Sequence, residues 1–471
     1  RQGREHHQAQ GSAARLDRWL IPDALADWLV YVRHEWCMPG DHAAVIMALC
    51  LPNAPTLGPG LRYFPVHVLF NSPLRSQLLD RLQAFSRTYA PSQDGDHPKY
   101  DAWMALKAQL LNDACDIARE HAAKIKARLR AVSAAVARVS QHYAAHPSPA
   151  AHAALAQATE LAREHLNLHA GRTAHAAVAM YGDYGERCTA FQFAQVGPPH
   201  RGEPIAELRD DEGHHVIMST VKDGRDITPI VRDHFSSDAP TGLYVPDRLA
   251  RAAEGPNGDG SITAPCVLQA LSRSANGKSP GPDGIPYEVY KALWDQLGDP
   301  LIDALNEIID LGAPTDEWAH GIIIPVYKGK GLPKDRLASY RPITLLNCDL
   351  RLLGGVAAGR LHDALDYVVS PQQTAFIRGR WIGDNVLDRQ SLAEWLEASD
   401  TPGCLIHLDI QQAYDRCDRE WLHRVAERMG FRDGMRLLLR VLCDGTTACL
   451  LVNGHRSAPF PVNNGLPQGG P

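Results

Sequence analysis

Residues 404–416 have the sequence CLIHLDIQQAYDR and decide the interpretation of the whole chain. Apolar side chains alternate through 405–410, which predicts a β-strand with two different faces. Asp409 stands near the end of this strand, on the face without the isoleucines, so its carboxylate can point into a cleft while the other face fills a core. Tyr414 follows five residues later, beside Asp415.

A nucleotide polymerase needs this arrangement at its centre. A buried strand would hold the carboxylate of Asp409 still against divalent metal ions, and the ring of Tyr414 would pack where the sugar of a nucleotide lies. An ordinary strand that leads into a helix, with Asp415 in the first turn, explains the same residues without catalysis. The segment alone leaves both interpretations open.

The composition is that of a globular protein, because 45% of the 471 residues are hydrophobic and 22% are charged. A domain size of about 150 residues predicts about three domains. No apolar run reaches the ~18 residues of a membrane span, and residues 1–10 lack the apolar segment of a secretory signal.

Ten scattered cysteines without a C-x-x-C pair predict a reducing, intracellular location without a structural zinc site. A net charge of −6 is unusual for a nucleic-acid binder, but a local basic groove is sufficient.

Changes of pattern divide the chain into four segments. Residues 1–50 combine short strand-like stretches with turns. Residues 51–180 begin with a Pro/Gly linker and continue as Ala-rich helix. Residues 181–260 hold short strands and turns, and residues 261–471 alternate helices with short apolar strands.

Two long helices are predicted within the second segment, at about 101–143 and about 150–180. The sequence HPSP at 146–149 breaks the helical pattern between them, which predicts an antiparallel helical hairpin. The basic side chains along the first helix are interpreted as a solvated helix face.

Two further motifs precede the central segment. Residues 277–286 (GKSPGPDGIP) form a turn before a predicted helix at 287–297, and their Gly and Lys spacing does not fit a phosphate-binding loop. Residues 322–331 (IIIPVYKGKG) predict an apolar strand that runs into a basic loop. A hairpin that carries Lys328, Lys330, Lys334, Arg336 and Arg341 could bind a triphosphate, Lys as a point charge and Arg as a fork, although a solvated hairpin is the simpler interpretation of these residues alone.

Two further motifs complete the series. Residues 372–385 (QQTAFIRGRWIGDN) form a basic turn that enters a helix, and residues 464–471 (NGLPQGGP) are rich in glycine. In this order the five motifs resemble the reverse transcriptase of non-LTR (LINE-type) retrotransposons, over roughly residues 181–471. One such motif arises easily by chance, whereas five in the same order do not.

The resemblance implies a mixed α/β fold, namely the fingers and palm of a right-hand polymerase with an antiparallel palm sheet backed by helices. It implies two Mg²⁺ ions, with Asp409 as the first metal-binding and catalytic carboxylate. Template RNA, primer or target DNA and dNTPs would be the partners, and residues 277–286 would contact the template. No membrane partner is expected.

The nucleotide site is implied in the same way. Lys328 and Arg341 would contact the phosphates, and Tyr414 would screen the 2′ position of the sugar, where the family usually has Phe. Gln468 and Gly469 would support the template and the nucleotide base.

Residues 1–50 resemble the closing strands of an apurinic-type endonuclease, which has the two-sheet α/β fold of the endonuclease/exonuclease/phosphatase type. Asp41 and His42 would act at the scissile phosphate, with the histidine oriented by a carboxylate. The family usually has Ser before this pair, where this chain has Gly40. Without sheet partners, residues 1–50 are expected to be poorly ordered or docked elsewhere.

The resemblance further implies a fragment cut at both ends, with most of the endonuclease upstream and an aromatic-x-Asp-Asp hairpin downstream. Residues 51–180 would be the linker with its helical hairpin, residues 181–260 an N-terminal extension of the polymerase, and residues 261–471 the fingers and palm. The isolated chain is therefore expected neither to polymerise nor to nick DNA. The parent protein would act as a ribonucleoprotein in nucleus and cytoplasm.

Three alternatives stay open at this point. The chain could be a non-catalytic nucleic-acid-binding relic of such an element. It could be a reverse transcriptase of the group II intron type, although that class would not carry the Asp41–His42 tail. It could also be a helical scaffold whose motifs are coincidental, in which case it should show no salt-dependent binding to RNA.

Overall fold

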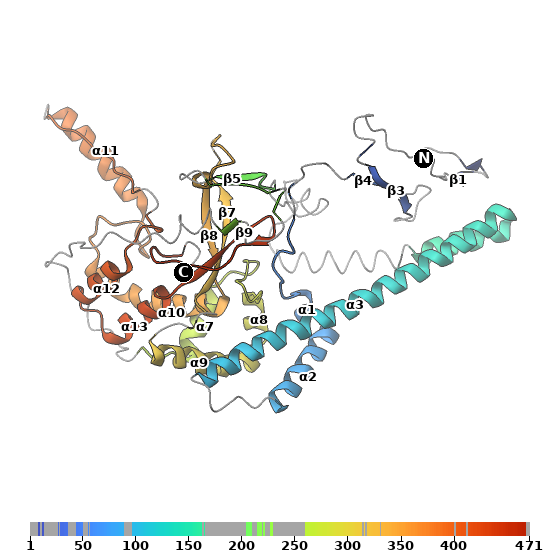
Figure 1. Cartoon of the computed structure of the whole chain (residues 1–471), viewed down its shortest axis with the longest axis horizontal. Coiled ribbons are helices and arrows are strands. Elements are labelled where there is room, and N and C mark those ends of the chain that lie inside the picture. The colour runs from blue at the N-terminus through green and yellow to red at the C-terminus, as the bar shows by residue number, and fades with distance from the viewer. Residues whose placement is uncertain are drawn as a thin grey trace. The chain divides into compact units, whose positions relative to one another are not determined.

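The computed structural model of the chain has two compact units (Figure 1). One comprises residues 1–55, 65–81 and 112–203, and the other comprises residues 56–64, 82–111 and 204–471. The structure describes residues 8–9, 12–13, 27, 29–35, 44–49, 55, 57–88, 97–162, 164, 204–209, 214–218, 220–221, 227–228, 260–312, 315, 318–329, 331–399, 402–410 and 413–467.

The described strands of the first unit form two antiparallel pairs. These are β1 (Gln8–Ala9) with β2 (Ser12–Ala13), and β3 (Leu29–Glu35) with β4 (Ala44–Leu49). Asp41 and His42, the predicted endonuclease pair, lie outside the described residues.

Helices make up the rest of the first unit as described. They are α1 (His67–Phe70), the first part of α2 (Ser72–Thr88), the part of α3 (Pro98–Ala145) from residue 112 onward, and a helix over 149–162. α3 confirms the helix predicted at 101–143, and the helix ends at the predicted break. The rings of Tyr143 and His152 meet edge to face at 5.7 Å across this break. The second predicted helix is described only as far as residue 164.

A five-stranded sheet forms the centre of the second unit (Figure 1). Its strands are β7 (His320–Tyr327), β8 (Tyr340–Leu345), β9 (Thr447–Val452), β10 (His455–Arg456) and β11 (Phe460–Pro461). β7 runs antiparallel to β8 and parallel to β9, and β10 and β11 are both antiparallel to β9. The sheet is therefore mixed, and the prediction of an antiparallel sheet was wrong because β7 and β9 are joined through intervening helices, a connection that lets strands run parallel.

Apolar side chains cover both faces of this sheet. On one face Ile323, Leu450 and Phe460 pack against Leu208 of the small hairpin β5 (Glu207–Arg209) and β6 (His215–Ile217). On the other face Ile322, Leu345 and Cys449 form a second apolar cluster. Burial on both faces explains why β7 has a continuous apolar run instead of an alternating pattern.

The second unit also contains the end of α2 and the part of α3 before residue 112. Its other described helices are α7 (Ala264–Arg273), α8 (Tyr287–Ala292), α9 (Trp294–Leu311), α10 (Cys348–Val368), α11 (Ile382–Ala398), α12 (Arg419–Arg428) and α13 (Asp433–Cys443). α10 packs against α7 and α13, and α13 packs against α9 and α12. The helix predicted at 287–297 is interrupted at Leu293. α9 ends at Leu311, and the following Gly312 has a left-handed φ of 71°, which closes the helix as glycine readily does.

The strand predicted at 405–410 is absent. Residues 402–410 are described without regular structure, and Leu408 and Ile410 are 90% and 74% exposed. The alternation of apolar and polar side chains favours an extended backbone with two different faces. A β-strand also needs a neighbouring strand that pairs with its backbone N–H and C=O groups. None of the described strands pairs with this segment.

No helix among the described residues is long and apolar enough to cross a membrane.

Candidate nucleotide-binding site

Lys328 and Arg341 are brought together by the β7–β8 hairpin. Arg341 is paired with Val326 in the ladder, and the backbone N–H of Lys328 donates to the carbonyl oxygen of Ser339 at 2.9 Å. Opposed residues share a face of an antiparallel pair, and so do residues two apart on one strand. Lys328 and Arg341 are therefore diagonal neighbours on one face. The Nζ of Lys328 donates to the carbonyl oxygen of Ala338 at 2.6 Å, which holds the ammonium group at the loop end of the hairpin.

Two tyrosines hold the loop of this hairpin. Tyr327 and Tyr340 are opposed in the ladder with ring centroids 5.7 Å apart. Their hydroxyls donate to the carbonyl oxygens of Leu332 and Lys334 at 2.5 and 2.6 Å. The loop is thus tied to its strands by side chains on the face opposite Lys328, which leaves two cations on a braced hairpin as a candidate anion site.

Tyr414 and the glycine-rich motif are in direct contact. The backbone N–H of Leu466 donates to the carbonyl oxygen of Tyr414, and that of Gly465 donates to Cys417, both at 2.8 Å. Gly465 has a φ of +80°, and a Cβ there would come within 2.7 Å of the Cα of Asp415 and the carbonyl oxygen of Tyr414. Only glycine allows this approach. Tyr414 is 47% exposed.

The buried side chain of Arg419 also binds the junction between Tyr414 and Gly465. Its side chain is 8% exposed, its Nε donates to the carbonyl oxygen of Gly465 at 2.9 Å, and its Nη2 donates to Oγ1 of Thr446 at 2.8 Å. Burial lowers the pKa of the guanidinium from its ordinary value, opposed by nearby Cys443 and Asp444. Arg419 was not predicted, because an arginine that opens a polar helix has the sequence pattern of a surface residue.

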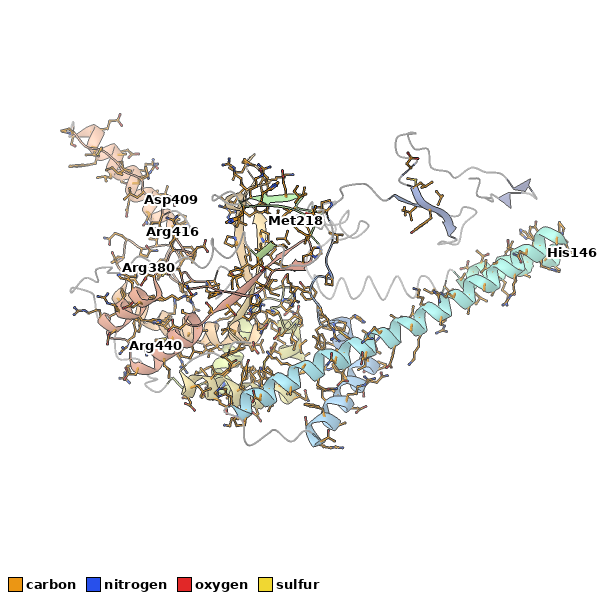
Figure 2. The ribbon with its side chains drawn as sticks, viewed as in Figure 1. His146, Met218, Arg380, Asp409, Arg416 and Arg440 are labelled. Carbon is orange, nitrogen blue, oxygen red and sulfur yellow. The ribbon has the colours of Figure 1, made fainter. Side chains whose placement is uncertain are left out.

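Asp409, the predicted metal-binding carboxylate, is exposed on the segment 402–410. Figure 2 labels Asp409 and Arg416, which lie on the segment that connects α11 to α12 in sequence. Carboxylate oxygens suit Mg²⁺, so Asp409 can supply one ligand. Among the side chains that the structure describes, no group of three His, Cys, Asp or Glu could hold an ion. The described residues therefore do not by themselves fit a two-ion site.

Phe376 is a second feature that the sequence did not single out. It has a φ of 62°, which is unusual for a bulky side chain, and its ring is 89% exposed. Arg380 braces the surrounding turn by donating to the carbonyl oxygens of Ser370 and Gln373 at 2.7 and 2.9 Å. Such strain at an exposed aromatic is typical of binding sites.

The family model for reverse transcriptase (RNA-dependent DNA polymerase) matches residues 332–471, which include Arg341, Asp409, Tyr414 and Gly465. The RNA-directed DNA polymerase from mobile element jockey of Drosophila melanogaster is 26% identical over 211 residues, which are 44% of this chain and 23% of that protein. The chain carries a reverse transcriptase domain of the non-LTR retrotransposon type.

Other relatives agree with this assignment. The transposon TX1 uncharacterized 149 kDa protein of Xenopus laevis is 26% identical over 210 residues, which are 45% of this chain and 16% of that protein. The Pol polyprotein from type-1 retrotransposable element R1 of Bradysia coprophila is 29% identical over 150 residues, 32% of this chain and 15% of that protein. Each alignment spans less than a quarter of the relative. The domain is thus neither a coincidental helical scaffold nor of the group II intron type.

Some of the predicted site residues lie close together in the structure, and others lie outside the residues that it describes. Lys328 and Arg341 share a hairpin, and Tyr414 is joined to the motif that begins at Gly465. Gln468 and Gly469 lie outside the described residues.

Proposed function

We propose that the reverse transcriptase domain copies an RNA template into DNA, in a protein that primes synthesis from a nicked chromosomal target. The observation that carries this proposal is the junction of Tyr414 with Gly465. Two motifs about fifty residues apart in sequence meet through backbone hydrogen bonds of 2.8 Å, and a cationic hairpin is present in the same unit.

Each predicted residue has a role in this proposal. Lys328 and Arg341 bind the triphosphate, the first as a point charge and the second as a fork. Tyr414 excludes the 2′-hydroxyl of a ribonucleotide, and Gln468 and Gly469 support the base and the template. Asp409 would supply one carboxylate ligand to Mg²⁺.

The loop at 277–286 contacts the template RNA in this proposal. Lys278 and Ser279 are exposed at its tip, whereas Pro280 and Gly281 are buried. A lysine on a fixed loop can neutralise a phosphate of the RNA backbone at little conformational cost. Asp41 and His42 stay proposed as the catalytic pair of an endonuclease, on the sequence alone, and the ribonucleoprotein in nucleus and cytoplasm stays a proposal of the same kind.

Primer extension by the full-length protein tests the assignment. Asp409→Asn keeps the size of the side chain and removes its charge, so it should abolish DNA synthesis on an RNA template while RNA affinity is unchanged. Asp388→Asn, an exposed residue of α11, is the matched control and should keep full activity. Extension that survives Asp409→Asn would refute the assignment.

A second candidate function applies to the 471-residue chain by itself. Because Asp409 is exposed and is the single proposed ligand among the described residues, we propose that this chain binds RNA without polymerising. Its affinity for RNA should fall steeply with salt while no dNTP is incorporated. Steady extension by the purified chain, abolished by Asp409→Ala, would contradict this.

A further inference from the structure

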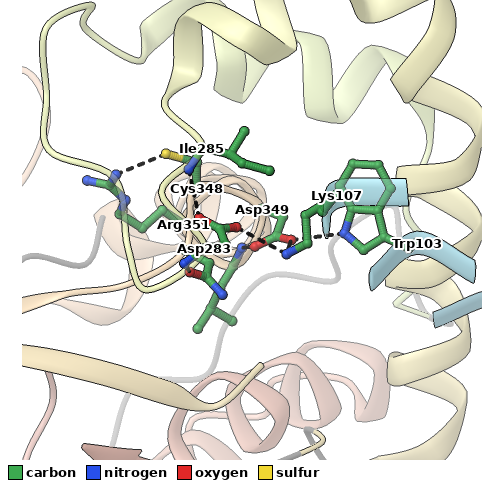
Figure 3. Close-up of polar contacts among 9 residues, drawn as sticks. Trp103, Lys107, Asp283, Ile285, Cys348, Asp349 and Arg351 are labelled. Carbon is green, nitrogen blue, oxygen red and sulfur yellow. Dashed lines mark hydrogen bonds and ion pairs between the residues drawn. The ribbon is translucent and has the colours of Figure 1, made fainter. Parts of the chain in front are cut away.

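A buried group of charged side chains includes Asp283 of the loop at 277–286 (Figure 3). Nζ of Lys107, from α3, is 2.6 Å from Oδ2 of Asp349 and 3.1 Å from Oδ2 of Asp283. Nε1 of Trp103 donates to the same oxygen of Asp349 at 2.9 Å. Lys107 is 2% exposed and Asp349 is fully buried, and all four residues belong to one compact unit.

The three charges depend on one another. Burial alone would lower the pKa of Lys107, but Asp349 and Asp283 outweigh it and the pKa lies above its ordinary value. Burial opposes the charged form of Asp349, yet Lys107 and the Trp103 hydrogen bond hold its pKa below the usual range. Burial raises the pKa of Asp283, against the pull of Lys107. Removing the lysine would leave two buried carboxylates without a cation, which is strongly destabilising.

Asp283 connects this group to the backbone of the loop. Its Oδ1 accepts the N–H of Ile285 at 3.0 Å, and its own N–H donates to Oδ1 of Asn347 at 3.1 Å. The next residue, Gly284, has a φ of +69°, and a Cβ there would lie 2.1 Å from the carbonyl oxygen of Arg62. The turn at 283–285 is therefore held by contacts that depend on Asp283.

Arg351 holds the other end of the loop. Its Nη2 donates to the carbonyl oxygen of Ser279 at 2.9 Å, and its guanidinium lies 4.8 Å from the ring centroid of Tyr287. The backbone on either side of the exposed Lys278 is thus anchored, since the N–H of Gly277 also donates to Oε1 of Glu288 at 2.5 Å. The tip is exposed to solvent between these two contacts.

We propose that Trp103 and Lys107 are positioning residues for the template contact of Lys278. They act through Asp349 and Asp283, although they come from a helix about 170 residues earlier in the chain. The proposal rests on the proposed function and extends it to α3, outside the residues 332–471 that the family model matches. The part of α3 before residue 112 then belongs functionally to the polymerase.

A thermodynamic cycle in RNA affinity tests the coupling. The dissociation constant for a single-stranded RNA oligonucleotide is measured over a salt series for the 471-residue chain and for K278A, K107M and the double variant. K278A should weaken binding several-fold and reduce the salt slope by roughly 0.7, the share of one phosphate contact. K107M should do the same, and the double variant should bind no worse than either single variant.

Independent effects would overturn the proposal. If K278A weakens binding by the same factor with and without Lys107, the lysine at 107 acts on stability alone. Lys99→Met is the matched control, because Lys99 lies on the same helix, is 57% exposed and pairs with Asp303 at 3.5 Å. It should leave both affinity and slope unchanged.

Hydrogen exchange separates this proposal from the proposed function. If the chain binds no RNA, or if K278A has no effect on RNA affinity, the proposed template contact of Lys278 is wrong. Hydrogen exchange of the loop at 277–286 then still tests whether Lys107 holds this loop. The amides of Asp283 and Ile285 should exchange at least tenfold faster in K107M, with no change in α9. Trp103→Phe keeps an aromatic ring but loses the indole N–H and its hydrogen bond to Asp349. It should show a smaller effect of the same kind and serves if K107M does not fold. Unchanged exchange in both variants would refute the positioning role.

Discussion

Nε of Arg419 donates a hydrogen bond of 2.9 Å to the carbonyl oxygen of Gly465, across 46 residues of sequence. The same side chain reaches Thr446, whose Oγ1 donates in turn to the carbonyl oxygen of Val462 at 3.3 Å. One buried guanidinium thereby joins the start of α12, the start of β9 and the segment after β11. The position of Tyr414 depends on this junction.

Arg419→Met should destabilise the reverse transcriptase domain by roughly 2–3 kcal/mol, since it leaves the carbonyl of Gly465 and the hydroxyl of Thr446 without their donor. Urea unfolding measures the loss. Arg436→Met is the control, because Arg436 makes only peripheral ion pairs with Glu427 and Asp433 at 3.0 and 3.2 Å and should cost less than about 1 kcal/mol. Equal losses in the two variants would show that the Gly465 contact contributes nothing.

Gly465→Ala should lower the free energy of unfolding by more than the strain of a left-handed backbone conformation alone. Gly379 has nearly the same φ, 79° against 80°, but a Cβ there meets nothing within 4 Å. Gly379→Ala should therefore cost about 1 kcal/mol, from backbone strain alone. At Gly465 the overlap with Asp415 and Tyr414 should raise the cost to roughly 3 kcal/mol. The close approach would be unimportant if both variants unfold at the same urea concentration.

Tyr414 should decide between deoxyribonucleotides and ribonucleotides in the full-length protein. Tyr414→Ala opens space at the sugar and should lower the preference for dNTPs by roughly tenfold or more. Tyr414→Phe keeps the ring and should keep the preference. Incorporation of each nucleotide on one RNA template gives the ratio, and a preference that survives Tyr414→Ala would remove this residue from the sugar site.

Arg341→Lys should raise the KM for dNTPs about tenfold with a smaller change in kcat, because a lysine cannot bind the phosphates as a fork. Single-nucleotide extension by the full-length protein provides both constants. Arg440→Lys on α13 is the conservative control and should leave KM unchanged. A KM unaffected by Arg341→Lys would place the triphosphate elsewhere.

His320 should make stability depend on pH. Burial in the sheet, with a smaller contribution from Arg456, lowers its pKa below the ordinary 6.5. The unfolded chain therefore binds more protons in this range, so the stabilisation is present above pH 6.5 and is lost as the pH falls through the folded pKa.

His320→Gln keeps a polar partner for Oγ1 of Thr447, which lies 3.0 Å from Nδ1 of the histidine. Urea midpoints between about pH 7.5 and about pH 5 should fall less steeply in this variant than in the wild type. His142→Gln on the exposed face of α3 should not alter the slope. Parallel slopes in the wild type and His320→Gln would contradict the assignment.

Sequence patterns predicted the elements that depend on local chemistry. The helical period and the Pro-containing break gave α3 and its end, and the run IIIPVYKGKG gave β7 and its loop, because helix period and turn residues act over a few positions. The order of motifs indicated the family. Lys328 and Arg341 could be assigned to one hairpin for the same local reason.

Features that depend on distant partners were missed. The segment around Asp409 has the alternation of a strand, but pairing requires a neighbour that no local pattern reveals. The parallel alignment of β7 with β9 likewise follows from packing across more than a hundred residues. Lys107 has the pattern of a surface lysine on a helix, and its burial depends on carboxylates 176 and 242 residues away.

The buried group of Lys107, Asp283 and Asp349 has a consequence for how this sequence can change over generations. Any single replacement leaves an unbalanced charge in the interior, whereas joint replacement by apolar residues of similar volume can be neutral. Related sequences should therefore keep all three residues or lose them together. Positions 107, 283 and 349 are expected to covary, with Trp103 following Asp349 because its indole N–H would otherwise lose its acceptor.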